Sequence, residues 1–315
     1  MARTRYAPDR GLTARMTATM FLLGLVFVAF IALIIGIGLA THGSTAVIAL
    51  FAVVLGGGML IGSLFYSDKI ALATAGAQEV TPQQAPQLHG IVDRICALAD
   101  MPKPRVAIAP TGMPNAFATG RNSEHAVLCV TEGLLRGGLT NEELEGVLAH
   151  EMSHVAHKDV VVMTVASFLG IIAGLMVRFA FYSELFGGGR RNNNNDNAAL
   201  MVFAVMIVSV VVYAISFLLI RLLSRYRELA ADRSAALLTG QPSALKSALV
   251  KVSQGIGRIP TQDLRAAEGL NAFYFAPAVS FSGGKSLSTL FSTHPSLERR
   301  LAELDKVAKQ LGQAR

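Results

Sequence analysis

The sequence predicts a mainly α-helical α+β protein of the membrane, with four transmembrane helices and a cytoplasmic domain that contains a small β-sheet. Three observations lead to this fold class. Of the 315 residues, 52% are hydrophobic and only 16% are charged, whereas about 25% are charged in a typical soluble domain. The apolar residues gather in four long runs. Between the runs, short strand-like stretches alternate with amphipathic helical ones, as expected for a mixed domain.

The four apolar runs are each long enough to cross a bilayer as a helix. They are residues 16–40, 45–66, 160–182 and 198–220. Only the third run contains a charged side chain, Arg178. A helix needs about 20 residues to cross a hydrocarbon core of about 30 Å, while a buried core helix is usually shorter. We therefore expect two transmembrane hairpins, 16–66 and 159–220, the second with an outer loop at 183–197.

Basic residues beside the apolar runs predict the orientation of the chain. They precede the first run and follow the second and the fourth: Arg3, Arg5, Arg10, Arg15, Lys69, Arg221, Arg225 and Arg227. The positive-inside rule then places the tail 1–15 and the segments 67–158 and 221–315 in the cytoplasm, although Arg190 and Arg191 in the outer loop weaken this assignment. The net charge of +7 is thus explained by membrane orientation, and we expect no nucleic-acid partner.

Residues 67–158 form the first part of the predicted cytoplasmic domain. A helix of about four turns is expected before Pro102 and Pro104. Strands are expected at 105–110, 114–120 and 126–130. Cys96 and Cys129 are expected in the core and unpaired, because disulfides are rare in the cytoplasm.

The next helix begins at Thr140, which forms a capping box with Glu143. No proline or glycine separates His154 from the third apolar run, so we expect one long helix or two nearly coaxial ones. The second part of the domain, 221–315, is expected to be helical. Its predicted elements are helices at 222–238, from Pro242 onward and at 296–311, with an irregular segment at 281–293.

The residues His150, Glu151 and His154 form an H-E-x-x-H pattern on the capped helix. Two histidines four residues apart project from one helix face, as a tetrahedral zinc site needs. A glutamate directly after the first histidine can act as general base toward a water molecule at the metal. A catalytic zinc site has three protein ligands and one open position, so a third ligand is required.

Two candidates exist for the third ligand. His157 lies on the neighbouring face of a continuous helix, so it reaches the same ion only if that helix breaks. Glu228 lies eight residues after the fourth run, and two spans return the chain to the side of His154. Asp232, four residues on, can accept a hydrogen bond from a ligand histidine and fix its tautomer. Alternatively, Glu228 forms an ordinary ion pair with a neighbouring arginine.

Four motifs together resemble one family. "PNAFATG", "LAHEMSHVAHKD", "RYRELAAD" and "STHPSLERR" occur in the order found in HtpX-type membrane zinc metalloproteases, which are relatives of the eukaryotic CAAX prenyl protease. The resemblance implies a zincin-like (gluzincin) catalytic domain that binds one zinc ion per subunit through His150, His154 and Glu228, with Glu151 as base. It also implies proteolysis of misfolded or damaged membrane proteins at the cytoplasmic face of the cell inner membrane, in quality control and stress response.

Two further sites follow partly from this resemblance. Asn115, Ala116, Phe117 and Ala118 are expected on an edge strand that binds an extended substrate by strand addition; the alternative is an ordinary strand and turn. His294 is expected to donate a hydrogen bond to the oxyanion; the alternative is a helix cap. Partners are then membrane-protein or unfolded polypeptide substrates and the lipid bilayer, and the oligomeric state is not predicted. The rival functions are a prenyl-CAAX-type protease and a non-hydrolytic zinc-binding membrane protein.

Overall fold

The structure is a computed structural model that describes residues 10–40, 44–187, 196–257 and 294–313. The chain divides into two compact units. Among the described residues, the first unit consists mainly of Leu64–Val161 and the residues from Ser224 onward, and the second of Arg15–Ser63 and Val162–Leu223. The irregular segment expected at 281–293 lies outside the described residues, as does most of the outer loop 183–197.

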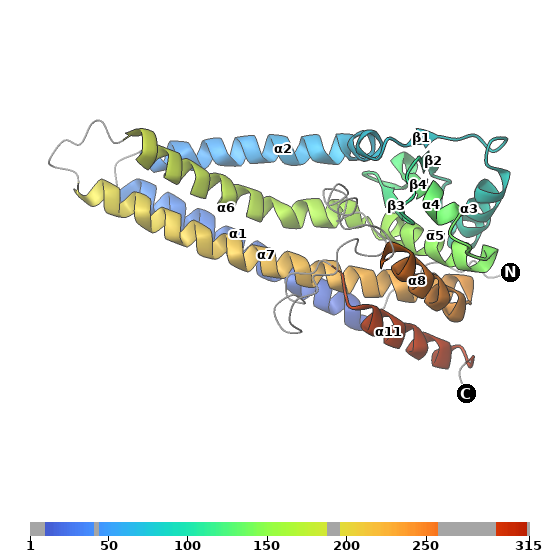
Figure 1. The fold of residues 1–315 in the computed structure, drawn as a ribbon. Helices are drawn as coiled ribbons and strands as arrows, with labels where there is room; N and C mark the ends of the chain where they lie inside the picture. Colours follow the sequence, from blue (N-terminus) through green and yellow to red (C-terminus); the bar gives the residue numbers. More distant parts are fainter. Residues whose placement is uncertain (1–9, 41–43, 188–195, 258–293, 314–315) are drawn as a thin grey trace. The chain divides into compact units, whose positions relative to one another are not determined.

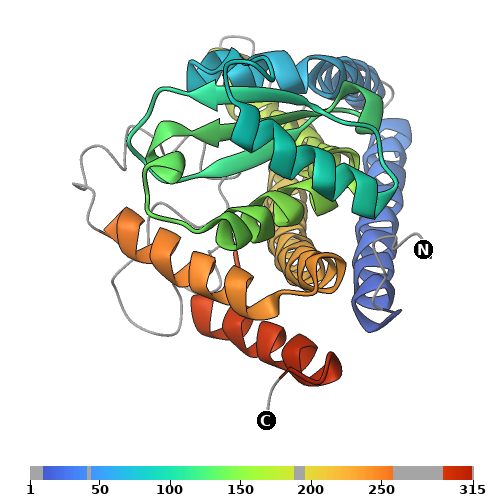
Figure 2. The ribbon, with the colours of Figure 1, turned by 90° about the vertical axis from the view of Figure 1, so that its right-hand side faces the viewer.

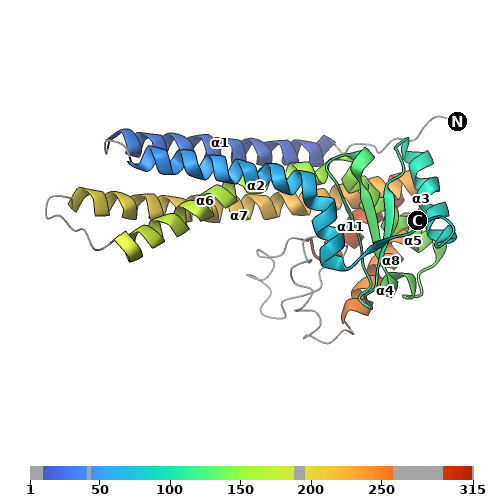
Figure 3. The same cartoon turned by 90° about the horizontal axis from the view of Figure 1, so that it is seen from above.

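The four apolar runs all lie in long helices, which supply the second unit (Figures 1 and 3). These helices are α1 (Arg10–Ala40), α2 (Ser44–Ala75), α6 (Asp159–Gly187) and α7 (Asp196–Thr239). In this unit Phe30 of α1, Ile172 of α6 and Val212 of α7 belong to one buried apolar cluster. Many other apolar side chains of these helices are exposed, as expected where lipid rather than protein covers a helix.

By length and composition, two segments of the described helices can cross a membrane. They are Thr13–Ala32 in α1 and Phe203–Thr239 in α7. A third, broken span results if Asn141–Ala156 and Asp159–Leu175 are taken together. The chain is therefore mostly helical with helices that can span a bilayer, while the number of four spans stays a prediction.

The sheet of the first unit contains four strands in the described part of the chain (Figure 2). They are β1 (Gln78–Glu79), β2 (Arg105–Ala109), β3 (Ala116–Thr119) and β4 (Val127–Thr131), in the spatial order β1-β2-β4-β3. β2 and β4 are parallel, and the other two pairs are antiparallel. The three strands expected at 105–110, 114–120 and 126–130 are thus present, and β3 lies at an edge of the sheet.

Apolar side chains cover both faces of this sheet. On one face, Leu128 of β4 belongs to the main core, together with Ile95 of α3 (Pro86–Ala99) and Met152 of α5 (Asn141–Ala156). On the other, Cys129 and Phe117 form a smaller cluster with Ala71 at the end of α2. Helices α8 (Pro242–Gly257) and α11 (Leu297–Gln310) extend the main core. The remaining short helices are η1 (Ser123–His125) and α4 (Glu132–Leu135). Both cysteines are buried and free, as expected.

The predicted capping box starts α5. The Glu143 backbone N–H donates to Thr140 Oγ1, and Thr140 N–H donates to Glu143 Oε2. The Glu143 carboxylate also accepts hydrogen bonds from Ser247 and Lys251 of α8, at 2.6 and 2.7 Å. The Glu143 side chain therefore satisfies one free donor at the start of α5, the Thr140 N–H, and also fixes α5 to α8.

The expectation of one long helix or two nearly coaxial ones after His154 is wrong. Helix α5 ends at Ala156, α6 begins at Asp159, and the two are bent by 56°. Between them Lys158 has a φ of 56°, the left-handed conformation that costs a non-glycine residue about 1–2 kcal/mol. No glycine or proline marks this break in the sequence, so surrounding contacts must stabilise it. The contacts of Asp159, directly after the break, do so in the site described next.

Candidate metal centre

His150 and His154 lie one turn apart on α5, beside core residues such as Leu148 and Met152. The apolar neighbours bury this face of the helix, so the two imidazoles are buried with it. Their Nε2 atoms face one another at 3.2 Å. The helical spacing therefore produces the paired nitrogens that the sequence predicted.

Glu228 of α7 completes a cluster of three. Its Oε2 lies 3.6 Å from His150 Nε2, and its Oε1 lies 3.5 Å from His154 Nε2. Bonds of about 2.0–2.2 Å at tetrahedral angles would separate ligand atoms by about 3.3–3.6 Å. The two distances involve different oxygens of Glu228; with one atom taken from each residue, the three ligand atoms lie within 4.8 Å of one another, close enough to share a metal ion. Among the described residues, this is the group of histidine and acidic side chains that could hold a metal.

The second nitrogen of each imidazole is bound to a buried aspartate. His150 Nδ1 lies 2.9 Å from Asp232 Oδ1, and His154 Nδ1 lies 2.6 Å from Asp159 Oδ2. A neutral imidazole donates one N–H to such a carboxylate and keeps a lone pair on the other nitrogen. The two Nε2 atoms then face each other across 3.2 Å, a separation that either a proton or a metal ion between them stabilises.

Formal charge also fits a divalent cation. The cluster contains four carboxylates, Glu151, Asp159, Glu228 and Asp232, all buried. Two guanidinium groups oppose them: Arg227 Nε lies 3.0 Å from Asp159, and Arg300 lies 2.7 Å from Asp232. With all four carboxylates ionised and both imidazoles neutral, as in a metal-bound site, four negative and two positive charges leave two negative charges. Buried charge is costly unless it is compensated, and a divalent metal would supply this compensation.

Glu151 lies beside the histidine pair and next to the edge strand. Its Oε2 accepts a hydrogen bond from the Ala118 N–H of β3 at 3.2 Å. Burial raises the pKa of Glu151 to about 8, so the carboxyl group can hold and release a proton near neutral pH. Burial by itself would lower the pKa of His150, but the adjacent Asp232 charge raises it to about 9. A proton and a metal ion therefore compete for this imidazole.

Comparison with known proteins identifies the family. Residues 82–308 match peptidase family M48. The Protease HtpX homolog 1 of Streptomyces coelicolor is 57% identical, over 99% of this chain and 98% of its own length. This chain belongs to the HtpX-type proteases of peptidase family M48. It is accordingly a metalloprotease, and the predicted resemblance is confirmed.

Other HtpX-type relatives and one solved structure agree. The Protease HtpX homolog of Moorella thermoacetica is 48% identical over 99% of this chain and 100% of its own length. That of Pyrococcus furiosus is 38% identical over 92% of this chain and 96% of its own. The crystal structure of S. mikatae Ste24p is similar with a TM-score of 0.50 at 18% identity, covering 94% of this chain and 67% of that chain. This last similarity concerns the fold alone.

His294 lies at the metal cluster of this HtpX-type protease. Its Nδ1 is 3.1 Å from Glu228 Oε2, and the side chain is buried. The cap of α11 is Ser296, whose side chain accepts from the Arg299 N–H. The alternative of a helix-cap histidine therefore does not hold, and His294 lies where it can contact a group bound at the cluster.

The predicted substrate strand is β3, with Asn115 directly before it. Asn115, Ala116 and Phe117 are buried, so what this edge can offer a partner is backbone rather than these side chains. The Asn115 N–H donates to Thr131 Oγ1 at 2.8 Å, which fastens the start of the strand to β4. The hydrogen bond from Ala118 to Glu151 joins the strand to the cluster.

Two residues of the site were missed by sequence reasoning. Asp159 holds His154, five positions earlier, and was hidden by the assumption of a continuous helix. Arg300 is buried, with its Nε and Nη2 each 2.7 Å from Asp232, whereas its neighbour Arg299 is exposed. A signal for Arg300 existed, since it lies three residues after Leu297 and four before Leu304 on the apolar face of α11.

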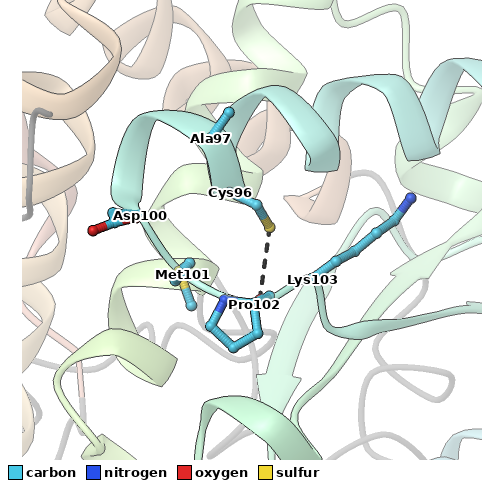
Figure 4. A pocket seen from close by; sticks show the side chains of 6 residues that line it. All are labelled: Cys96, Ala97, Asp100, Met101, Pro102 and Lys103. Carbon is cyan, nitrogen blue, oxygen red and sulfur yellow. Dashed lines mark hydrogen bonds between the residues drawn. The ribbon is translucent and has the colours of Figure 1, made fainter. Parts of the chain in front are cut away.

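A separate pocket lies at the end of α3 (Figure 4). It has a volume of about 550 Å³ and is lined by Cys96, Ala97, Asp100, Met101, Pro102 and Lys103. None of these residues belongs to the metal cluster. Burial raises the pKa of the Cys96 thiol to about 11, so this cysteine is a weak nucleophile and the pocket has no reactive group from it.

Proposed function

We propose that this HtpX-type protease is a zinc-dependent endopeptidase that cleaves misfolded or damaged membrane proteins at the cytoplasmic face of the cell membrane. The observation that carries the proposal is the compact, buried cluster of His150, His154 and Glu228 with Glu151 beside it. It occurs in a chain that has helices able to span a bilayer. A structural zinc site would have no use for Glu151, so the cluster favours hydrolysis over simple metal storage.

The donor set favours zinc and one ion per subunit. Two imidazole nitrogens and one carboxylate are a ligand set of catalytic zinc sites, which keep a fourth position open. When bound, such an ion acts as a Lewis acid that polarises a carbonyl group and makes water more acidic. His150, His154 and Glu228 would hold it, and Asp232 would fix the tautomer of His150.

Glu151 is the proposed general base and acid. It takes a proton from the attacking water and returns it to the amine that leaves when the peptide bond breaks. Its buried position matches this task, because a carboxyl group with a raised pKa accepts a proton and keeps it until it is needed. His294, held against Glu228, is placed to donate a hydrogen bond to the negative charge that develops on the carbonyl oxygen.

The edge strand is the proposed substrate platform. An extended peptide that pairs with β3 would be bound through main-chain hydrogen bonds, which carry little sequence information. The contact between Ala118 and Glu151 brings such a peptide to the base. Loose sequence preference combined with a membrane location suits a protease that removes damaged membrane proteins rather than one that processes a single substrate.

The test is a cleavage assay on full-length protein in detergent, with an unfolded membrane protein as substrate. The wild type should cleave it only with zinc present, and Glu151→Gln should keep zinc but lose activity. Glu145→Gln is the matched control, because Glu145 lies buried on the same helix but pairs with Arg94 instead of the cluster. Full activity of Glu151→Gln would reject the mechanism. Cleavage of prenylated peptides but not of unfolded proteins would favour the CAAX-type alternative.

A further inference from the structure

The break between α5 and α6 places Asp159 in contact with His154, the second histidine of the cluster. Asp159 is the first residue of α6, and its Oδ2 lies 2.6 Å from His154 Nδ1. The same oxygen lies 3.0 Å from Arg227 Nε. Asp159 is almost fully buried, and the side chain of Arg227 is only 12% exposed. An ion pair this deeply buried requires close mutual contact to offset its desolvation.

This arrangement repeats the one at the first histidine. There Asp232 contacts His150 Nδ1 at 2.9 Å and Arg300 at 2.7 Å. In both sets an arginine Nη2 lies 3.5 Å from the Nδ1 atom of the imidazole. Each histidine of the cluster is thus supported by one aspartate, and each aspartate by one arginine, although the four supporting residues come from three different helices.

We propose that Asp159 and Arg227 form a positioning pair that holds His154 in the tautomer and orientation needed to bind the metal. The inference rests on the proposed ligand set, and it assigns to this pair the role that Asp232 and Arg300 have at His150. Asp159 accepts a hydrogen bond from the Nδ1–H group of His154, so the proton stays on Nδ1 and the Nε2 lone pair points toward the metal. Arg227 holds the carboxylate in place and balances its charge.

The backbone supports this reading. Lys158, directly before Asp159, has the left-handed conformation with a φ of 56°. A non-glycine residue adopts it only where other interactions stabilise it. Here the turn brings Asp159 back toward His154, which a continuous helix would not do at a spacing of five residues. The contacts between Asp159, His154 and Arg227 offset the cost of the turn.

The two pairs differ in their hydrogen bonding. Arg300 donates hydrogen bonds to both oxygens of Asp232, from Nε and Nη2, each at 2.7 Å. Asp159 Oδ2 forms a hydrogen bond with His154 Nδ1 and an ion pair, but no hydrogen bond, with Arg227 Nε, and Asp159 Oδ1 has no hydrogen-bond partner within the described residues. We therefore expect the pair at His154 to adjust metal affinity with a smaller effect on folding than the pair at His150.

The experiment measures zinc affinity of the full-length protein in detergent, by competition with a chromophoric chelator. Asp159→Ala and Arg227→Ala should each raise the Kd for zinc about 10–100-fold, the usual effect of removing such a support. Asp159→Asn should lose less zinc affinity, because its amide oxygen still accepts a hydrogen bond from the Nδ1–H group of His154. The double variant Asp159→Ala with Arg227→Ala should be no weaker than Asp159→Ala alone, since Arg227 acts through Asp159. Glu145→Gln, a buried carboxylate on α5 away from the cluster, should keep the wild-type Kd.

Failure of this inference can be told from failure of the proposed function. The controls are His154→Ala and Glu228→Ala, which should lose zinc. If they do, the positioning role would be overturned by a zinc Kd within about threefold of wild type in all three variants Asp159→Asn, Asp159→Ala and Arg227→Ala. If His154→Ala and Glu228→Ala also bind zinc as the wild type does, the ligand set itself is wrong. If the alanine variants fail to fold, Asp159→Leu and Arg227→Met decide, because they remove the polar contacts but largely fill the same space; an unchanged Kd in both would overturn the inference.

Discussion

Replacing Arg300 with alanine should destabilise the fold far more than the same change at its neighbour Arg299. Arg300 is buried and forms a bidentate ion pair with Asp232, whereas Arg299 is exposed. Within the described part of the chain, removing Arg300 leaves the Asp232 carboxylate fully buried with His150 as its one remaining partner. Truncating one partner of a buried ion pair costs about 3–5 kcal/mol. The remaining contact with His150 places the expected loss near the lower end, about 3 kcal/mol.

A loss of this size is large against a total folding free energy of about 5–15 kcal/mol. It can be measured by urea unfolding of the full chain in detergent, followed by proteolysis of the unfolded fraction. Arg299→Ala should change stability by less than about 0.5 kcal/mol, as surface substitutions usually do. Combining Arg300→Ala with Asp232→Asn should cost less than the sum of the two single changes, because the unpaired buried charge is gone. An Arg300→Ala protein within about 1 kcal/mol of Arg299→Ala would refute the reasoning.

Two other predictions follow from the same region. At pH 7 the metal-free protein should hold protons on His150 and Glu151, whose pKa values are raised to about 9 and about 8. Zinc binding at pH 7 should therefore release at least one proton per ion, and this number should fall toward zero above about pH 9. Calorimetry in buffers of different ionisation enthalpy measures the number of protons released. A value of zero at pH 7 would contradict the prediction. Lys158→Gly should preserve stability or raise it by up to about 1 kcal/mol, because glycine adopts a positive φ without strain. Lys158→Pro fixes φ near −65° and should destabilise the protein by more than this; equal thermal unfolding temperatures for the two variants would show that the turn is not required.

The parts of the site that local pattern defines were predictable from the sequence. The spacing of His150 and His154 places them on one helix face, and the capping box of Thr140 and Glu143 marks where that helix starts. Glu228 required a topological argument, since two apolar runs return the chain to the same side. The structure brings Glu228 within 3.6 Å of both histidine Nε2 atoms.

Two features of the residues that support the ligands could not be predicted from the sequence: the role of Asp159 and the pairing of Arg300 with Asp232. Asp159 depends on the left-handed Lys158, and lysine gives no sequence signal for that conformation. Periodicity places Arg300 on the buried face of α11, but a face does not identify its partner. Asp232 is 68 positions away from Arg300 in the chain, and local propensity carries no information over such a distance.

The charges of the cluster make metal binding part of folding as well as of catalysis. With every carboxylate ionised and both imidazoles neutral, four buried carboxylates and two guanidinium groups leave two negative charges, which a divalent ion or protons on His150 and Glu151 can balance. An ion that binds the folded chain and not the unfolded one stabilises the fold by its binding free energy. The cluster joins α5, the start of α6, α7 and α11, so this energy holds together segments that are distant in sequence. Residues that support the ligands, such as Asp159 and Arg300, are therefore tied to stability and to metal affinity at once.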